Sequence, residues 1–356
     1  MWTMDVHVVS QPVGTVWDLR TWPTGHFMWE ILNAPSGVDG GHFVMASGTF
    51  QEALDAQAID PGGTAFLQGY YPPAALTLGV LPQDAGAQTA PPLTVQVYNA
   101  DSGSFHVNAV LVAGKTDAVL LDTGFTRADA LRIAAMVLDS KKTLRTIYIS
   151  QADPDYYFGI EVLKQHFPDA QVVATAPTLK KIEATLPTKL QVWGPRMGAN
   201  APKGVPLPEV LAGNTITLEG QTLEVRGLDD SLPHRSYVWI PSIKTIAGGV
   251  NVYAGLHLWT ADAQSPQERA DWAKKLGTMA ALQPAVVIPG HSLPGQKQDA
   301  SQLTWSQAYL AHFEQELPKA ATSTALIEAM KRAYPQAGLG IALDIGAKVN
   351  KGEMKW

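Results

Sequence analysis

Hydrophobic and polar positions follow a clear pattern only after residue 92. LTVQVYN at 93–99 alternates between the two kinds, and SFHVNAVLVAG at 104–114 and TDAVLLDTG at 116–124 are rich in aliphatic residues and end on glycine. Such runs are typical of β-strands. The same reasoning predicts further strands at 144–150, 171–176, 237–241, 244–250 and 285–291, and a β-hairpin over 213–228 that turns at Glu219-Gly220.

Helical spacing appears between these strands. RADALRIAAMVLDS at 127–140 places Leu131, Ala134, Ala135 and Leu138 on one predicted apolar stripe. Ser265-Pro266-Gln267-Glu268 has the form of a capping box with proline at the first helical position, so a helix is expected there, with Trp272, Leu276 and Met279 on its apolar face. Other helices are predicted at 158–166, after Pro177, at 302–316 and at 322–333.

The order of these elements predicts an α/β fold. Strands followed by helices occur in two successive halves, which favours a sandwich of two sheets with helices on the outside. We therefore divide the chain into an N-terminal extension (1–90), an αββα core (91–300) and C-terminal helices packed on that core (301–356).

The N-terminal extension differs from the rest of the chain. It lacks lysine, and short strands are expected only near 42–46. Ala85-Gly86-Ala87 follows a short apolar run in the small-x-small pattern of a signal-peptidase site, although no basic region precedes it. Two interpretations are open. Either this is a signal segment, and the protein is periplasmic or secreted and begins near Gln88, or it is a loop of small residues in a cytoplasmic protein.

Composition limits the class of function. With 46% apolar and 16% charged residues and no stretch of 18 apolar residues, the chain is expected to be globular without a membrane span. It contains no cysteine, which excludes thiol nucleophiles and thiolate metal sites. The formal charge of −6 and the lack of basic clusters argue against nucleic acid as a partner. A small-molecule substrate is expected, and the oligomeric state is left open.

The polar residues of interest all follow predicted strands, where loops of α/β folds commonly carry functional groups. The most informative loop is QADPDYYFG at 151–159, which has two carboxylates two residues apart and no histidine. The others are Asp122 after AVLL, Asp229, Asp230 and His234 after LEVRG, Gly248-Gly249 after KTIA, and His291 after VVIPG.

This arrangement resembles the metallo-β-lactamase-fold hydrolases over about residues 92–295. Asp122-Thr123-Gly124 matches the family's Asp-x-Gly, and His291 in IPGH matches its final histidine. The family's His-x-His-x-Asp-His motif is altered. Gln151 and Asp153 stand in its first two histidine slots, Asp155 keeps the aspartate and Tyr156 takes the last slot. His234 matches a later histidine, Gly249 falls on the bridging aspartate, and the loop is similar to that of an exported branch of the family.

The resemblance implies a four-layer αββα sandwich with a metal site. Its candidate ligands are Gln151, Asp153, Asp155, His234 and His291. Because this set is weighted towards oxygen, one divalent ion is expected, with calcium or another hard cation favoured, mononuclear zinc as the alternative and a zinc pair disfavoured by Gly249.

Each candidate has a plainer alternative. Asp153 and Asp155 could cap a helix that begins near Tyr157, and His234 and His291 could be hydrogen-bonded structural groups. Tyr157, His257 and Trp259 could line the substrate pocket or belong to the core. Asp122 and Asp230 are expected to support the site without contacting the metal.

Two hypotheses about function follow. The first is a metal-assisted hydrolase of an ester or lactone (acyl-homoserine-lactone-like), or else a phosphodiester, in which Asp153 or Asp155 accepts a proton from water and Tyr156 stabilises the oxyanion. The second is a binding protein that keeps the fold and has lost the chemistry.

Overall fold

The computed structural model describes residues 92–356 and four short strands before them, at 4–8, 17–21, 27–31 and 43–45. The chain divides into two units, Met1–Thr89 and Ala90–Trp356. In the first unit the strands pair in the order β2-β3-β1-β4; they are β1 (Met4–Val8), β2 (Trp17–Thr21), β3 (Phe27–Ile31) and β4 (Phe43–Met45). Strand β4 lies where a short strand was expected. The signal-like Ala85-Gly86-Ala87 lies outside the described residues.

The second unit contains a six-stranded sheet in the order β10-β9-β8-β7-β6-β5. Strands β5, β6 and β7 are antiparallel, and β7 to β10 run parallel. The bounds are β5 (Thr94–Asn99), β6 (Asn108–Ala113), β7 (Asp117–Leu121), β8 (Thr143–Ile149), β9 (Gln171–Ala174) and β10 (Glu209–Val210).

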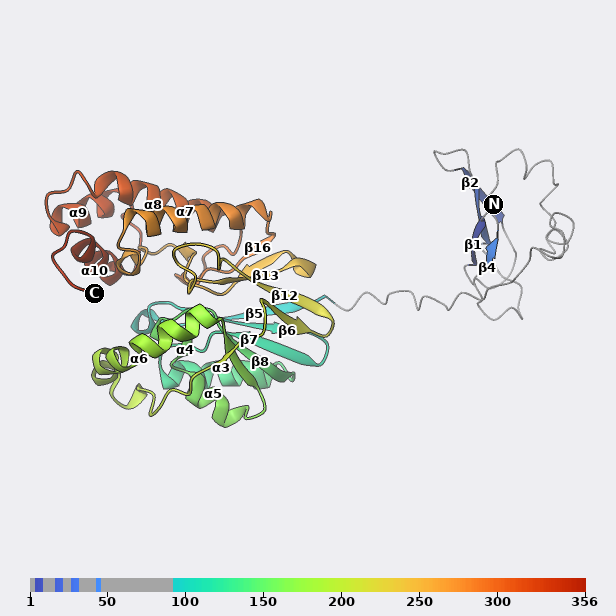
Figure 1. Cartoon of the computed structure of the whole chain (residues 1–356), viewed down its shortest axis with the longest axis horizontal. Helices are drawn as coiled ribbons and strands as arrows, with labels where there is room; N and C mark the ends of the chain where they lie inside the picture. Colours follow the sequence, from blue (N-terminus) through green and yellow to red (C-terminus); the bar gives the residue numbers. More distant parts are fainter. Residues whose placement is uncertain (1–3, 9–16, 22–26, 32–42, 46–91) are drawn as a thin grey trace, which may run out of the picture. The chain divides into compact units, whose positions relative to one another are not determined.

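A five-stranded sheet lies opposite, in the order β11-β12-β13-β14-β16 (Figure 1). Its strands are β11 (Thr215–Leu218), β12 (Gln221–Arg226), β13 (Tyr237–Ile240), β14 (Thr245–Ala247) and β16 (Val286–Val287). Two short strands, β15 (Tyr253–Ala254) and β17 (His291–Ser292), form a separate parallel pair. His291 therefore belongs to β17, beyond the end of the strand that the sequence predicted to finish on it.

Helices cover the outer faces of both sheets, which gives the αββα sandwich that the sequence predicted (Figure 1). The first sheet carries α3 (Arg127–Asp139), α4 (Pro154–Tyr157), α5 (Ile160–His166) and α6 (Ala176–Met197). The second carries α7 (Pro266–Ala281), α8 (Ser301–Glu316), α9 (Ser323–Ala333) and α10 (Gly340–Asn350). Short 3-10 turns occur at Ser102–Ser104, Gly198–Asn200, Pro241–Ile243 and Thr260–Asp262.

Strand β6 shows why the layers form. All six of its residues are buried, and successive side chains point to opposite faces of the sheet. Ala109 and Leu111 pack towards the helices, whereas Val110 and Val112 pack between the two sheets. A strand whose odd and even positions are both apolar must be buried on both faces of its sheet, and the sandwich buries both faces.

The apolar face of α3 differs from the predicted one. Of the predicted stripe Ala134 is buried, whereas Leu131 and Leu138 are 50% and 61% exposed, and the buried apolar residues are Ala130, Ile133, Ala134 and Val137. Both stripes have helical spacing, so periodicity alone did not decide between them.

The capping box of α7 is confirmed: the Ser265 hydroxyl accepts from the amide of Glu268, whose carboxylate accepts from the amide of Ser265. Trp272, Leu276 and Met279 are fully buried, also as predicted. Helix α10 was not predicted, because it begins at Gly340 without a side-chain cap. In the described part of the chain, no helix has both the length and the apolarity that a bilayer span requires.

The hairpin β11–β12 turns at Glu219-Gly220 as predicted, and Glu219 ties it to the first sheet. Its carboxylate accepts hydrogen bonds from the backbone amides of Lys115, Thr116 and Asp117, at 2.6–2.8 Å. These bonds to the charged form lower the pKa of Glu219 from 4.5 to about 2.

This contact predicts a pH-dependent contribution to stability. The folded-state pKa of Glu219 is lowered, so its contribution is complete above the unfolded value of 4.5 and is lost as pH falls towards about 2. Glu219→Gln is therefore expected to have a lower melting temperature than the parent at pH 7. In circular-dichroism melts, this gap in melting temperature should narrow between pH 4.5 and pH 2. A gap that stays constant over this range would contradict the assignment.

Candidate active site

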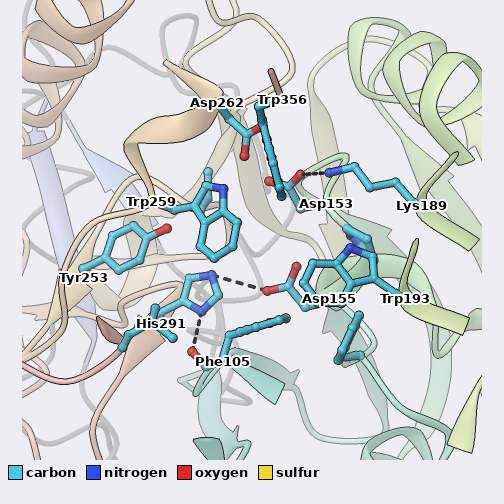
Figure 2. Close-up of a pocket in the computed structure, with 14 residues that line it drawn as sticks. Phe105, Asp153, Asp155, Lys189, Trp193, Tyr253, Trp259, Asp262, His291 and Trp356 are labelled. Carbon is cyan, nitrogen blue, oxygen red and sulfur yellow. Dashed lines mark hydrogen bonds and ion pairs between the residues drawn. The ribbon is translucent and has the colours of Figure 1, made fainter. Parts of the chain in front are cut away.

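The candidate site is a small cavity where the loop after β8 meets β17 (Figure 2). Its volume is about 30 Å³, room for about one water molecule or one small functional group. Three carboxyl groups, one imidazole and one ammonium group lie among apolar, mainly aromatic walls. The lining residues are Phe105, Phe125, Asp153, Pro154, Asp155, Lys189, Trp193, Val250, Tyr253, Trp259, Asp262, His291, Leu339 and Trp356.

Asp155 and His291 form the central contact. Asp155 Oδ2 lies 3.4 Å from His291 Nε2, and both side chains are more than nine-tenths buried. His291 Nδ1 lies 2.9 Å from the carbonyl oxygen of Phe105, so the neutral ring is assigned its proton on Nδ1 and Nε2 is left as an acceptor. The ring of Tyr253 stacks on the imidazole at 5.0 Å and fixes its plane.

Burial decides the protonation of this pair. It raises the pKa of Asp155 well above the ordinary value and lowers the pKa of His291 to about 4. A carboxylate and an unprotonated Nε2 would both be acceptors at this contact. Burial therefore favours the neutral form of both groups, with a protonated Asp155 carboxyl facing an unprotonated His291 Nε2.

Asp153 occupies the N-cap position of α4 but makes no side-chain capping bond. Its Oδ1 pairs with Lys189 Nζ at 3.0 Å, and its Oδ2 accepts a hydrogen bond from the side-chain Nε2 of Gln151 at 3.2 Å. Burial opposes ionisation of Asp153, but the nearby ammonium group outweighs it and holds the pKa of the carboxyl below its usual value. The helix-capping alternative for Asp153 is thus wrong, and its partner is a cation from α6.

The segment after β12 brings Arg235 to the interior in place of the predicted His234. Arg235 is fully buried and pairs with Gln151 in an isolated antiparallel bridge. His234 lies in a turn that is closed by a hydrogen bond from the Arg235 amide to the carbonyl oxygen of Leu232, and only Arg235 joins the bridge. His234 accordingly lines a larger groove of about 970 Å³ between α6 and the loop at 262–268, and it does not line the cavity.

The two tyrosines after Asp155 lie behind the cavity wall. Tyr156 is fully buried, with its ring 5.7 Å from that of His291 in a T-shaped contact. Tyr157 is also fully buried and packs against Phe158 in the core under α3 and α5. Tyr156 can support His291, whereas neither ring lines the cavity. Tyr157, predicted to line the substrate pocket, therefore belongs to the core, which is the alternative that the sequence left open.

The other predicted residues divide between cavity and core. Trp259 lines the cavity, while His257 is buried with Nδ1 at 2.9 Å from the hydroxyl of Tyr309 under α8. Asp230 pairs with Lys275 at 3.1 Å outside the site. The Lys275 ammonium group also donates to the backbone carbonyl oxygen of Arg235. This hydrogen bond anchors the segment that carries Arg235.

Asp122 supports the site through Ser150, in line with its expected secondary role. It directly follows β7 with φ +68°, and both the amide and the hydroxyl of Ser150 donate to its carboxyl group. Burial raises the pKa of Asp122 to about 7. The Ser150 hydroxyl also accepts from the amide of Gly249, and the Ser150 carbonyl accepts from the hydroxyl of Ser236, so four loops meet at one serine.

Several residues of the site were not predicted from the sequence. Lys189 and Trp193 come from α6, and Asp262 follows Trp259 in the loop before α7. Trp356 separates the cavity from the groove, with its indole nitrogen donating to Asp262 Oδ1 at 2.7 Å. Asp262 lies three positions after Trp259, which was predicted to line the pocket, so the sequence could have pointed to Asp262 as well. No spacing in the sequence pointed to Lys189 or Trp356.

Comparison with known proteins identifies the class. Residues 102–291 match the family described as the metallo-beta-lactamase superfamily, and the chain belongs to that superfamily. Its members are typically metal-dependent hydrolases. No curated protein matches the sequence.

One solved structure supports the fold, and a second is similar over a smaller part of the chain. A metallo-beta-lactamase family protein from Thermus thermophilus superposes with a TM-score of 0.50 at 16% identity, over 74% of this chain and 92% of its own. A metallo-beta-lactamase from Pontibacter korlensis gives a TM-score of 0.44 at 18% identity, over 62% of this chain and 96% of its own.

The residues present do not fit the divalent metal, commonly zinc, that the superfamily usually binds. Among the described residues, no group of three or more His, Asp or Glu side chains converges on one point. Asp153 is engaged by an ammonium group, and a guanidinium group lies inside where His234 was expected. The predicted set of five ligands is therefore corrected to one close pair, Asp155 and His291.

Proposed function

We propose that the protein hydrolyses a small ester or lactone, with Asp155 and His291 as its proton-transfer pair. The observation that carries this proposal is the 3.4 Å contact between Asp155 Oδ2 and His291 Nε2 on the wall of a buried cavity. A carboxyl and an imidazole that have one proton between them in a water-sized space are suited to general acid–base catalysis.

The chain's own groups suggest how the proton moves. Asp262 also lines the cavity, and its Oδ2 has no hydrogen-bond partner among the described residues. In the proposed reaction, water adds to the acyl carbon as Asp262 accepts its proton. The carbon–oxygen bond to the leaving group then breaks as the Asp155–His291 pair protonates that oxygen. Release of the acid and re-equilibration with solvent restore both groups.

The surroundings favour an acyl substrate with an apolar body. Phe105, Trp193, Trp259 and Trp356 line the cavity, and ring contacts of 5.3–5.9 Å connect Phe105 to Trp193 and Trp259 and connect Trp259 to Trp356. The adjoining groove shares Asp153, Lys189, Trp193, Asp262 and Trp356 with the cavity and can take a longer acyl chain. A phosphodiester remains the second substrate class to be tested.

A substrate panel tests the proposal. p-Nitrophenyl acetate and butyrate, an acyl-homoserine lactone and bis-p-nitrophenyl phosphate would be assayed with parent protein and with Asp155→Asn. Turnover of an ester or lactone by the parent, lost in Asp155→Asn and retained in the presence of a chelator, is the expected result. Equal rates for the two proteins on every substrate would remove Asp155 from the chemistry.

The alternative is a binding protein without hydrolytic activity. It is favoured by one observation, namely that Lys189 pairs with Asp153 and Arg235 pairs with Gln151 in a backbone bridge, so that side-chain cations stand beside two positions of the altered metal motif. Ligand binding without turnover of any substrate in the panel would support this alternative over hydrolysis.

A further inference from the structure

The cavity is smaller than the proposed reaction requires. Its volume of about 30 Å³ holds about one water molecule or one small functional group. Hydrolysis of an ester needs the attacking water and the acyl carbon with its chain in the site at the same time. Part of the cavity wall must therefore move before a substrate reaches Asp155 and His291.

Trp356 is the part of the wall that can move at the least cost. Elsewhere the aromatic wall is packed from several sides: Phe105, Phe125 and Trp193 contact one another with ring centroids 5.2–5.6 Å apart. Phe125 and Trp193 are also buried. Trp356, by contrast, is 40% exposed, and it is the only exposed residue among the described residues that line the cavity.

Few contacts hold the Trp356 ring in place (Figure 2). Its indole nitrogen donates to Asp262 Oδ1 at 2.7 Å. Its ring centroid lies 5.5 Å from that of Trp259 and 5.7 Å from Lys189 Nζ. These are one hydrogen bond and two contacts of ring faces and edges, which a bound ligand could replace.

The segment before Trp356 allows the ring to turn. It is anchored at Glu353, whose carboxylate accepts hydrogen bonds from the amide and the hydroxyl of Ser323. Met354 and Lys355 follow the anchor, are exposed, and have no hydrogen-bond partner in the described part of the chain. Rotation about these two residues would move Trp356 without breaking the anchor.

The groove lies on the other side of Trp356 and is large enough to take a ligand chain. Its volume is about 970 Å³, and Trp356 is one of five residues that it shares with the cavity. Val192, Ile345 and Met354 give the groove apolar surface close to this boundary. Displacement of the Trp356 ring would join the two spaces into one site.

The charges of both spaces favour a neutral ligand. In the cavity, Asp153 offsets Lys189, burial favours the neutral forms of Asp155 and His291, and Asp262 is a further acid that would repel an anion. The charged side chains of the groove are nearly balanced, with four bases and three acids: Lys181, Lys189, Arg196 and Lys355, and Asp153, Asp262 and Glu268.

We propose that Trp356 is a gate between the cavity and the groove, and that a neutral acyl compound with a long apolar chain opens it. The carbonyl head group enters the cavity, and the chain lies in the groove where the ring has moved aside. A short chain cannot replace the contacts of the ring, whereas each further buried methylene strengthens binding about fourfold. The inference rests on the proposed function for the acyl class of ligand, but its test does not depend on turnover.

Chemical labelling of His291 tests the gate. Diethyl pyrocarbonate acylates unprotonated imidazole and is larger than the cavity, so His291 is expected to react slowly in the parent protein at pH 7. In Trp356→Ala, loss of the hydrogen bond and the ring contacts should make His291 react about tenfold faster or more. Trp356→Phe keeps a ring but loses the donor to Asp262, so its rate should lie between the two. Peptide mass spectrometry gives the rate at each histidine.

Two other histidines are internal standards for this experiment. His166 is exposed on α5 and should react at the same rate in every variant, whereas His257 is buried under α8 and should stay slow. A fast reaction of His257 would indicate unfolding, in which case Trp356→Phe decides by the same readings. Leu138→Ala is the matched control, because Leu138 is an exposed apolar residue of α3 that lines neither space. It should label like the parent.

Protection of His291 in Trp356→Ala tests the class of ligand. Methyl ketones offer a carbonyl head group that cannot be hydrolysed, and 2-pentanone and 2-nonanone differ by four methylenes. The concentration that halves the labelling rate should fall about fourfold per methylene from the first ketone to the second. Nonanoate, the anionic analogue of similar length, should protect far more weakly than 2-nonanone.

Three outcomes would overturn the inference. If His291 reacts no faster in Trp356→Ala than in Leu138→Ala, Trp356 does not close the cavity. If protection is independent of chain length, the groove does not take the chain, and if nonanoate protects better than 2-nonanone, the ligand is an anion. Because every reading is a labelling rate, failure of the hydrolase proposal would be seen separately, as absent turnover in the substrate panel.

Discussion

Gly249→Ala is expected to prevent stable folding of the domain. Gly249 has φ +78°, and a Cβ atom built there would lie 2.0 Å from the carbonyl oxygen of Ser236. The clash is with backbone, and the amide of Gly249 is held by the Ser150 hydroxyl, so neither side can move freely. Backbone strain and overpacking together are expected to cost about 4 kcal/mol or more. Urea denaturation and soluble yield measure the effect.

Gly213→Ala is the matched control. Gly213 has φ +74°, but nothing lies within 4 Å of the added Cβ, so only the left-handed conformation is penalised. A loss of about 1–2 kcal/mol is expected. If Gly249→Ala were no worse than Gly213→Ala, the clash with Ser236 would not be real.

The clash at Gly249 also determines whether a metal pair could be restored by substitution. The resemblance to the superfamily placed its bridging aspartate at Gly249, and any side chain at this position meets the Ser236 carbonyl. Gly249→Asp is therefore not expected to restore a metal pair, because the backbone has closed that position.

The second large effect is expected at the proton-transfer pair. Asp155→Asn and His291→Gln should each lower kcat of the ester or lactone reaction by about 10²–10⁴-fold, the usual contribution of general acid–base catalysis. The double variant should lose little more than either single one, since both residues act through the same proton. Steady-state kinetics on the best substrate of the panel measures this, and His166→Gln, at a histidine of α5 outside the cavity, is the control.

The pH profile gives a second measurement. The pair should carry one proton through neutral pH, because the pKa of Asp155 is raised and that of His291 is lowered to about 4. Activity should therefore fall at acid pH, where Asp262, whose pKa burial raises, becomes protonated and where, below about pH 4, the pair gains a second proton; it should fall again at alkaline pH, where the proton of the pair is lost. A rate that rises without limit with pH would indicate attack by hydroxide without help from the pair.

Much of the fold could be predicted because local patterns and tertiary packing agree. Strand β6 has apolar residues that face both sides of its sheet. The capping box of Ser265 and Glu268 begins α7, and the β11–β12 hairpin turns at Glu219-Gly220. The prediction was wrong about the buried face of α3, because two sets of apolar residues have helical spacing there. It missed α10, because that helix begins without a side-chain cap.

The candidate site was predicted less completely. The loop after β8 and His291 were chosen correctly as neighbours, since both follow strands. His234 and Arg235 are adjacent in sequence, and only the bridge between Arg235 and Gln151 determines which of them faces inward. Lys189 lies 36 positions from Asp153, and Trp356 lies 94 positions from Asp262, separations at which sequence patterns do not encode contact.

The junction at Ser150 has a mechanical consequence. Its bonds reach Asp122 after β7, Ser236 before β13 and Gly249 after β14, so one residue couples the ends of interior strands in both sheets. Sliding of one sheet over the other would break several buried bonds at once. The two halves of the sandwich should consequently behave as a rigid body, and adjustment to ligands of different size falls to the α6 and Trp356 side of the cavity.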